Sequence, residues 1–545
     1  MKARASTNPS TAHPEILLTT LNATWEHASF GLRCLFAALG PLQERARIQE
    51  HTIKDRPTDI VEQILAQKPC IVGMGVYIWN ARETLEVVQQ LKILRPDLVV
   101  VLGGPEVSHE MDNQALTDIA DFVVQGEGEV AFSALCHSLL EADRSVSEMA
   151  TEKTPSSPKS LPIQGNVIPT KAASADDARV IPGGRPDVTS VFRASSPYDW
   201  YSDQDLKHRV VYLEASRGCP FSCEFCLSSL DEKVRTFPLD DFLAHMEALM
   251  QRGLQRFKFV DRTFNLKIQD ATRILDFFLD RFKPGMFLHF EMIPDRLPAP
   301  LRERLARFPL GAVQLEVGIQ TFSEDVSALI SRRQNVAKLE ENLRWLRTHT
   351  GVHIHADLIA GLPGEDFDSF GRGFNQLYAL KPHEIQLGVL KRLRGAPIDR
   401  HSAEYGMRYN QTPPYEVLQT GALDFTELQR LKRLARFFDM VHNSGRFPDT
   451  VQLMVGQDPF CDWLTFADWL WQKTNATAGI ALSRLTELLL DYLVGEKGVQ
   501  EDIARRALEN DRGRDRVAGL PKRQGLHARG VSPEALATKQ VRAVS

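Results

Sequence analysis

Three cysteines, Cys219, Cys223 and Cys226, lie within eight residues of the segment SRGCPFSCEFC (216–226). Their spacing is C-x3-C-x2-C, and no second C-x2-C pair follows. A structural zinc site normally closes with four ligands, and the next histidine, His245, lies on an expected helix, so zinc is the less supported metal. Thiolates also hold [4Fe–4S] clusters, which normally take four cysteines. Three cysteines would leave one iron open to a small molecule.

The composition excludes several classes of protein. The chain has 545 residues, 43% of them hydrophobic, and a net charge of −5, so no bulk charge attracts nucleic acid or an anionic membrane. The other four cysteines are scattered singly, which argues against a disulfide framework. The first residues show no secretory signal, and no apolar run approaches the ~20 residues that span a bilayer. We expect a cytoplasmic protein without a membrane or nucleic-acid partner.

Residues 13–142 alternate strand-like with helix-like segments. Such alternation predicts a Rossmann-like parallel sheet covered on both faces. Ligands of these sheets bind at the carboxyl ends of the strands, where this chain carries glycine, hydroxyl and amide residues. Gly103, Gly104 and Gly126 are among them and would let a large cofactor approach the backbone. The four expected strands are EILLTTLN, CIVGMGVYIW, LVVVLGG and DFVVQGEGE.

A second α/β region follows a polar segment. Residues 143–195 are rich in Ser, Pro, Thr, Lys and Asp, which predicts a linker. Strand and helix patterns alternate again through 196–399, in six units that fit a partial (β/α)6 barrel. The cysteine segment directly follows the first of these strands, RVVYLEAS (209–216). Because a barrel carries its chemistry on the loops after its strands, the cysteines stand where a barrel enzyme needs them.

The C-terminal part has a different pattern. Residues 400–495 are expected to form a helical domain rich in aromatic residues. Residues 496–545 hold 11 Lys and Arg against 7 Asp and Glu, which predicts a solvated, partly disordered tail and gives only weak support to nucleic-acid contact. A stripe of apolar residues at helical spacing indicates core packing rather than a cofactor site; it comprises Leu428, Leu431, Leu434 and Phe438.

A C-x3-C-x2-C segment after the first strand of a partial barrel resembles the radical S-adenosylmethionine (radical SAM) enzymes. In that family the open iron is chelated by the amino and carboxylate groups of S-adenosylmethionine, and the reduced cluster cleaves it to a 5′-deoxyadenosyl radical. The resemblance implies that Cys219, Cys223 and Cys226 hold a [4Fe–4S] cluster. It also implies that Phe225 packs near the adenine.

Three later segments fit the same family. VDRTFN (260–265) ends the second strand, LEVGIQT (315–321) resembles the fourth-strand segment, and IAGLPGE (359–365) resembles the fifth-strand loop. The Gly-Gly-Glu segment that the family usually carries after the second strand is absent, so Asp261 and Asn265 are assigned in its place. The contacts that the resemblance implies are Asp261 and Asn265 for the methionyl amine, Glu316 and Gln320 for the nucleoside, and Gly361 for the adenine edge.

The N-terminal domain resembles the cobalamin-binding domain that precedes many radical SAM barrels. NATWEHASFGLRCL, VYIWN, GGPEVS and VQGEGE closely resemble a subgroup with a helical C-terminal extension (DUF4080-like), over roughly residues 15–495. The motif Asp-x-His-x-x-Gly, whose histidine binds cobalt in many such domains, is absent. We therefore do not assign His27 as a cobalt ligand; a role in loop order or in a pocket wall is favoured. Gly103, Gly104 and Gly126 would line the cobalamin.

The resemblance implies an enzyme with three cofactors, a [4Fe–4S] cluster, S-adenosylmethionine and cobalamin. The expected reaction is cobalamin-dependent methyl transfer to an unactivated carbon of a small-molecule substrate. A one-electron donor such as flavodoxin or ferredoxin would reduce the cluster. Two alternatives stay open: a radical rearrangement or cyclisation without methyl transfer, and a non-catalytic cobalamin or redox sensor.

A basic run follows the sixth strand of the expected barrel. Lys391, Arg392 and Arg394 stand at the barrel mouth, where cations bind anionic groups of substrates. A solvated basic edge explains the same run equally well. The sequence does not name the substrate.

Overall fold

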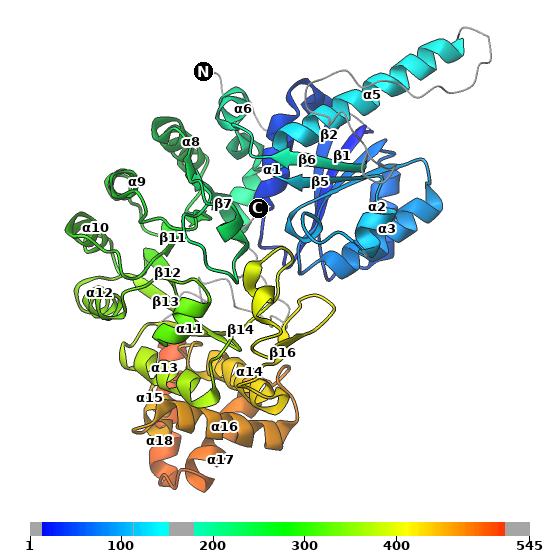
Figure 1. Cartoon of the computed structure of the whole chain (residues 1–545). Coiled ribbons are helices and arrows are strands. Elements are labelled where there is room, and N and C mark those ends of the chain that lie inside the picture. The colour runs from blue at the N-terminus through cyan, green and yellow to red at the C-terminus, as the bar shows by residue number, and fades with distance from the viewer. Residues whose placement is uncertain (1–12, 113, 152–178, 518–545) are drawn as a thin grey trace.

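The computed structural model describes residues 13–112, 114–151 and 179–517. Within them, two six-stranded parallel sheets are followed by a group of helices (Figure 1). The α/β fold class is therefore confirmed. None of the helices described combines the length and the apolar character needed to cross a bilayer.

The first sheet has the strand order β2-β1-β3-β4-β5-β6, with all pairs parallel. Apolar side chains of α1 and α5 form a core on one face, and those of α2 and α3 form a second core on the other. The strands are β1 (Ile16–Asn22), β2 (Ala46–Thr52), β3 (Ile71–Gly75), β4 (Val99–Gly103), β5 (Phe122–Gly126) and β6 (Val180–Gly184). The helices are α1 (Phe30–Ala38), α2 (Pro57–Ala66), α3 (Ala81–Leu94), α4 (Ala115–Ile119) and α5 (Glu129–Thr151).

Two strands of this sheet were not expected from the sequence. β2 is mostly polar, and β6 lies within the range expected to be a linker. Both are edge strands, with one neighbour each, so their sequences need no long apolar run. Between the sheets lie the short helices α6 (Thr189–Ala194) and α7 (Asp203–His208).

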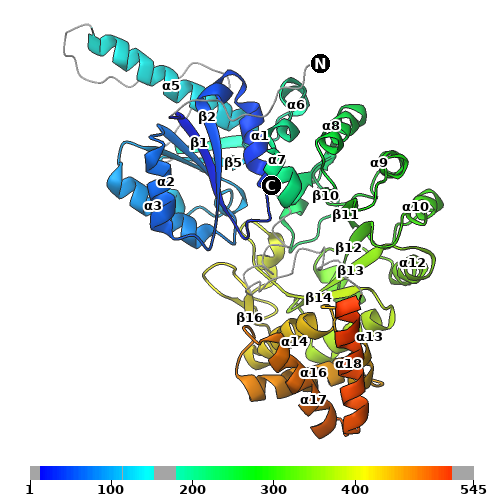
Figure 2. The same ribbon diagram turned by 180° about the vertical axis from the view of Figure 1, so that it is seen from behind.

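The second sheet has the order β14-β13-β12-β11-β10-β7 and is also fully parallel. Its helices lie on the outer side of the curved sheet, as in an open barrel (Figures 1 and 2). The strands are β7 (Val211–Leu213), β10 (Arg256–Phe259), β11 (Phe287–Met292), β12 (Val313–Gln320), β13 (His353–Ala360) and β14 (Glu384–Val389). The helices are α8 (Leu239–Gln251), α9 (Ile268–Asp280), α10 (Ala299–Leu305), α11 (Glu324–Leu329), α12 (Val336–His349) and α13 (Phe367–Ala379).

The helical region gathers at the β14 end of the barrel sheet (Figure 2). Helix α14 packs against β14 and α16, and the predicted apolar stripe of α14 is buried. The helices are α14 (Phe425–Val441), α15 (Pro448–Met454), α16 (Pro459–Thr474), α17 (Leu482–Gly495) and α18 (Glu501–Val517). A hairpin of β15 (Arg408–Tyr409) and β16 (Val417–Gln419) precedes them.

Helix α18 corrects the expected tail. It packs against α15 and α17, with Ala504, Leu508 and Asp511 buried. The Asp511 carboxylate accepts hydrogen bonds from the backbone of Asp449 and Thr450, both at 3.0 Å. The many charges of α18 mask this buried stripe in the sequence, whereas residues 518–545 of the expected tail lie outside the described part of the chain.

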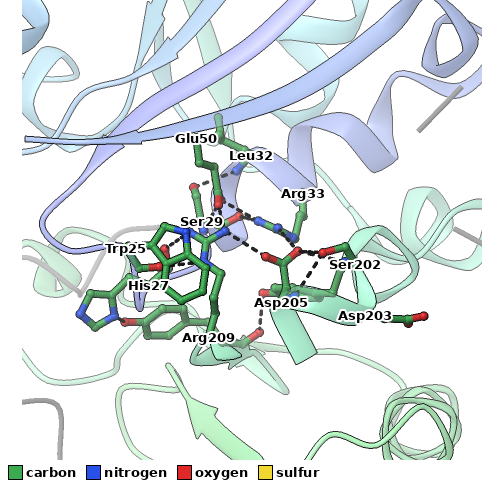
Figure 3. Close-up of polar contacts among 12 residues, drawn as sticks. Trp25, His27, Ser29, Leu32, Arg33, Glu50, Ser202, Asp203, Asp205 and Arg209 are labelled. Carbon is green, nitrogen blue, oxygen red and sulfur yellow. Dashed lines mark hydrogen bonds and ion pairs between the residues drawn. The ribbon is translucent and has the colours of Figure 1, made fainter. Parts of the chain in front are cut away.

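A buried charge network joins the N-terminal domain to the segment before the barrel (Figure 3). Arg33 of α1 donates to Glu50 of β2 at 2.8 Å and to Asp205 of α7 at 2.9 Å. Arg209 contacts the same two carboxylates and donates to the backbone oxygen of Trp25 at 2.9 Å. Two guanidinium groups thus balance two carboxylates. Each buried charge needs its partners, because one left alone costs several kcal/mol.

Candidate functional site

A cavity of about 690 Å³ opens at the carboxyl ends of the barrel strands. All three clustered cysteines and Phe225 line it. Its other walls include the ends of β11 to β14, the segment before α12, and α14. The barrel therefore places the cysteine segment at its active face, as barrel enzymes do.

A two-strand clasp holds the cysteine loop. β8 (Ser216–Arg217) pairs antiparallel with β9 (Arg235–Thr236), and the backbone N–H of Cys219 donates to the Asp231 oxygen at 2.8 Å. Gly218 has φ +91°, and a Cβ there would lie 2.7 Å from the Lys233 oxygen. Only glycine fits this turn without strain. The loop is thus fixed at both ends before its thiols meet any ligand.

The three thiols lie close to one another, with Cys219 buried and Cys223 and Cys226 half-buried. Burial raises the pKa of Cys219 to about 11, and the neighbouring thiols Cys226 and Cys223 add to the rise. Burial also raises the pKa of Cys223, against the opposing effect of Arg332, whose Nη1 lies 3.6 Å from the sulfur. Iron must therefore displace protons from these thiols when it binds.

The donor set fits three ligands of an iron–sulfur cluster. Soft sulfur donors from one loop face one cavity, which suits iron held by thiolates. Among the described residues, no group of three or more His, Cys, Asp or Glu side chains converges on a single ion position.

Glu316 and Gln320 lie in the same cavity as the cysteines. Both come from β12, where the register with β13 shifts between Gly318 and Gln320. Gln320 has φ +74°, an uncommon conformation for a residue with a side chain, which costs on the order of 1–3 kcal/mol. Its Oε1 atom is buried without a hydrogen-bond partner in the described structure. Glu316 accepts a hydrogen bond from His289 Nε2 at 2.9 Å.

Three other residues with an expected S-adenosylmethionine contact, Asp261, Asn265 and Gly361, do not line this cavity. Asp261 accepts hydrogen bonds from Ala215 N at 3.0 Å and Ser216 Oγ at 2.6 Å, so it orders the start of the cysteine loop. Burial raises the Asp261 pKa to about 6. Asn265 binds the loop after β11, and a Cβ on Gly361 would meet Val417 Cγ1 at 2.6 Å. These three residues support loops and packing.

A second cavity, of about 350 Å³, lies between the N-terminal sheet and the barrel. Gly103, Gly104 and Gly126 all line it, at the ends of β4 and β5. Gly104 has φ +108°, and a Cβ there would lie 2.5 Å from the Val76 oxygen. The two cavities adjoin, because Ser228 and Arg262 line both of them.

The sequence analysis missed the histidine of this second cavity. His109 follows the GGPEVS segment and is the one histidine in the cavity lining. Burial lowers its pKa, which keeps the ring neutral at ordinary pH. His27 lies elsewhere, with Nδ1 2.5 Å from the Tyr212 hydroxyl where the two domains meet. The position of His109 in the segment that follows β4 was the available signal.

The three basic residues after β14 do not share one role. Arg392 donates to Glu110 at 2.7 Å, and Arg394 donates to Glu106 at 3.2 Å. Both carboxylates belong to the loop after β4, so these arginines join the barrel to the N-terminal domain. Neither substrate binding nor a solvated edge, the two alternatives from the sequence, describes them. Lys391 alone of the three lines the larger cavity.

Three protein-family models match the chain in succession. Residues 17–136 match the B12 binding domain, residues 213–375 the radical SAM superfamily, and residues 403–512 the DUF4080 family, described as a protein of unknown function. The chain is therefore a radical SAM protein with a cobalamin-binding domain ahead of the barrel and a DUF4080 region behind it. These domains imply a [4Fe–4S] cluster, S-adenosylmethionine and cobalamin as cofactors.

Two curated relatives are methyltransferases. The chain is 24% identical over 465 residues to 2-(S-pantetheinyl)-carbapenam-3-carboxylate methyltransferase of Streptantibioticus cattleyicolor, covering 78% of this chain and 65% of the relative. It is 23% identical over 466 residues to the cobalamin-dependent radical SAM methyltransferase TokK of Streptomyces tokunonensis, covering 78% and 62%. The chain thus spans slightly less than two thirds of these relatives.

One solved structure shares the fold. It is the radical S-adenosylmethionine methyltransferase TsrM from Kitasatospora setae with cobalamin and a [4Fe–4S] cluster bound. The TM-score is 0.52 at 18% identity, and the match covers 75% of this chain and 82% of that chain.

Proposed function

We propose that the protein is a cobalamin-dependent radical SAM methyltransferase acting on an unactivated carbon of a small molecule. The observation that carries the proposal is the pair of adjoining cavities. One is lined by three clustered cysteines and the other by the strand-end glycines of a B12-binding domain. Their shared walls, Ser228 and Arg262, bring the two cofactor sites within reach of one substrate. Both curated relatives named above are methyltransferases, and TokK is a cobalamin-dependent radical SAM methyltransferase.

The residues divide the work of binding. Cys219, Cys223 and Cys226 would hold the cluster, with Phe225 packed beside the S-adenosylmethionine. Cluster and S-adenosylmethionine together supply a 5′-deoxyadenosyl radical, and methylcobalamin supplies the methyl group. Glu316 and Gln320 also line this cavity; we propose that they contact the nucleoside, where the unpaired Gln320 Oε1 can accept a hydrogen bond.

In the smaller cavity, cobalamin would lie against the backbone at the strand ends of the N-terminal sheet. Gly103, Gly104 and Gly126 offer no side chains, so a flat macrocycle can approach the strand ends closely. His109 and apolar side chains of the N-terminal domain line the same space. We propose that Asp261 and Asn265 act as positioning residues for the loops rather than as contacts of S-adenosylmethionine. A one-electron donor such as flavodoxin or ferredoxin would reduce the cluster.

The test is an anaerobic turnover experiment with the cofactor-loaded protein. On reduction with S-adenosylmethionine present, we expect S-adenosylhomocysteine and methylcobalamin, the latter by its absorption spectrum. Addition of the correct substrate should give 5′-deoxyadenosine as well. Formation of 5′-deoxyadenosine without S-adenosylhomocysteine would replace this proposal with a radical rearrangement or cyclisation. Absence of any S-adenosylmethionine cleavage would favour the sensor alternative.

A further inference from the structure

One wall of the larger cavity carries a cluster of cations that the radical chemistry does not use. It consists of Lys391, Lys432, Arg433 and Arg436, here called the basic wall. From β14 onward, the cavity lining contains these four cations and one carboxylate, Glu416. The whole chain carries a net charge of −5, so this excess is local.

Two elements bring the basic wall together. Lys391 follows the end of β14, and the other three residues lie on α14, at positions that share one side of a helix. Helix α14 lies beside β14 (Figure 1), and these three residues of α14 line the same cavity as Lys391. The wall therefore belongs to the helical C-terminal region as much as to the barrel.

The contacts of the basic wall leave positive charge unbalanced. Lys432 pairs with Glu416 at 2.5 Å, which neutralises one cation. Arg436 Nε donates to the backbone oxygen of Thr477 at 2.9 Å, and its Nη1 lies 3.9 Å from Asp439 Oδ2, a long ion pair that offsets only part of its charge. The Arg433 guanidinium lies over the Trp471 ring, 5.2 Å from its centroid, and its Nε is buried without a hydrogen-bond partner in the described structure.

A solvated basic surface does not explain this arrangement. Lys391 is only 3% exposed, and the nearby carboxylate that acts on it, Glu416, already pairs with Lys432. Burying a cation or an N–H donor without a partner costs free energy, so such groups persist where a ligand completes them. Arginine and lysine together are the residues that bind carboxylates and phosphates in proteins.

We propose that the basic wall binds an anionic group of the substrate, a carboxylate or a phosphate, and so selects small acidic molecules. The role of that molecule as methyl acceptor rests on the proposed function. The anion binding itself does not, because it involves none of the residues that would hold the cluster or cobalamin. The helical C-terminal region then has a task, which is to supply the substrate-recognition side of the barrel cavity.

The experiment measures anion binding to the whole protein. The probes are inorganic phosphate and, separately, acetate, titrated calorimetrically into anaerobic protein that carries oxidised cluster, cobalamin and saturating S-adenosylmethionine. The bound S-adenosylmethionine prevents the probes from occupying its own carboxylate site. We expect saturable binding of at least one probe, and the preferred probe identifies the anionic group of the substrate.

Variants locate the binding. The double variant Lys432→Gln, Arg433→Gln should weaken the affinity roughly tenfold or more, as expected for lost hydrogen bonds between charged groups. The single variant Lys391→Gln should do the same and decides the matter if the double variant fails to fold. The matched control is Arg430→Gln on the same helix, which pairs with Asp468 outside the cavity and should bind within about twofold of the unchanged protein.

Two results would overturn the inference. One is the absence of saturable phosphate and acetate binding by the unchanged protein. The other is an affinity that stays the same in the folded double variant and in Lys391→Gln. Either result leaves S-adenosylhomocysteine formation untouched as the test of methyl transfer, so the two proposals fail separately.

Discussion

The two cavities of this protein differ at the strand ends that border them. The larger one is lined there by polar side chains such as Glu316 and Gln320, whereas the smaller one has bare glycines at the strand ends and carries charged side chains, such as Arg217, elsewhere in its wall. The larger cavity therefore offers side chains to its ligands, and the smaller one leaves side chains out where the strands end. A substitution should therefore act in different ways, by removing a functional group in the larger cavity and by adding an atom in the smaller.

The largest effect is expected at the cysteine loop. Cys223→Ala removes one of the three proposed thiolate ligands, so the anaerobically reconstituted protein should lose the visible absorbance of the cluster and all S-adenosylmethionine cleavage. Iron and sulfide analysis measures the first loss, and chromatography of 5′-deoxyadenosine measures the second. Cys461→Ala, at an exposed lone cysteine, is the control and should keep both. A full cluster in Cys223→Ala would break the ligand assignment.

The next largest effect is expected at the buried charge network between the N-terminal domain and the segment before the barrel. Glu50 pairs with both Arg33 and Arg209 (Figure 3), so Glu50→Gln leaves two buried guanidinium groups with one carboxylate. We expect a loss of about 3–5 kcal/mol in the free energy of unfolding, measured by denaturant titration.

The control for this network is a more exposed pair that joins the N-terminal domain to the segment after β14. Arg392→Gln removes the half-exposed contact with Glu110, which should cost about 1 kcal/mol or less. Equal losses in Glu50→Gln and Arg392→Gln would show that burial of the first network contributes nothing to domain docking.

The smaller cavity offers a matched pair of neighbouring glycines. Gly104→Ala places a Cβ 2.5 Å from the Val76 oxygen in the left-handed region, so the variant should lose about 2 kcal/mol of stability. Gly103→Ala meets its nearest atom at 3.6 Å and should fold normally, with weaker cobalamin binding in an absorbance titration. Cobalamin binding that is unchanged in Gly103→Ala would contradict recognition through bare backbone.

The same contrast explains what the sequence could predict. The cysteine segment and the strand-end glycines are local patterns, and the structure places the thiols in one cavity and Gly103, Gly104 and Gly126 in the other. Both parallel sheets followed from the alternation of apolar segments. The edge strand β6 could not be predicted in this way, because its five residues include two glycines and a proline and show no alternation of apolar and polar residues.

The basic wall could not be predicted from the sequence, for a physical reason. Lys391 was noted with its neighbours, but Arg392 and Arg394 turned out to bind carboxylates of the N-terminal domain. The cations that accompany Lys391 are some forty residues further on, and only the packing of α14 on β14 brings them near. The sequence pattern of a helix shows on which face a charged residue lies, but it does not show which residues of other elements that face will meet.

The smallest expected effect is a pH dependence of the basic wall. Burial lowers the pKa of Lys391 to about 8, with Glu416 opposing the shift and Lys432 adding to it. The ammonium group is therefore charged below this pH and neutral above it. Acetate keeps its charge throughout, so its binding should weaken a few-fold as the pH rises through about 8. In Lys391→Met, binding should already be weak and should not change over the same range. An affinity that is independent of pH in the unchanged protein, or an equal decline in Lys391→Met, would remove Lys391 from the anion site and leave the three cations of α14 to form it alone.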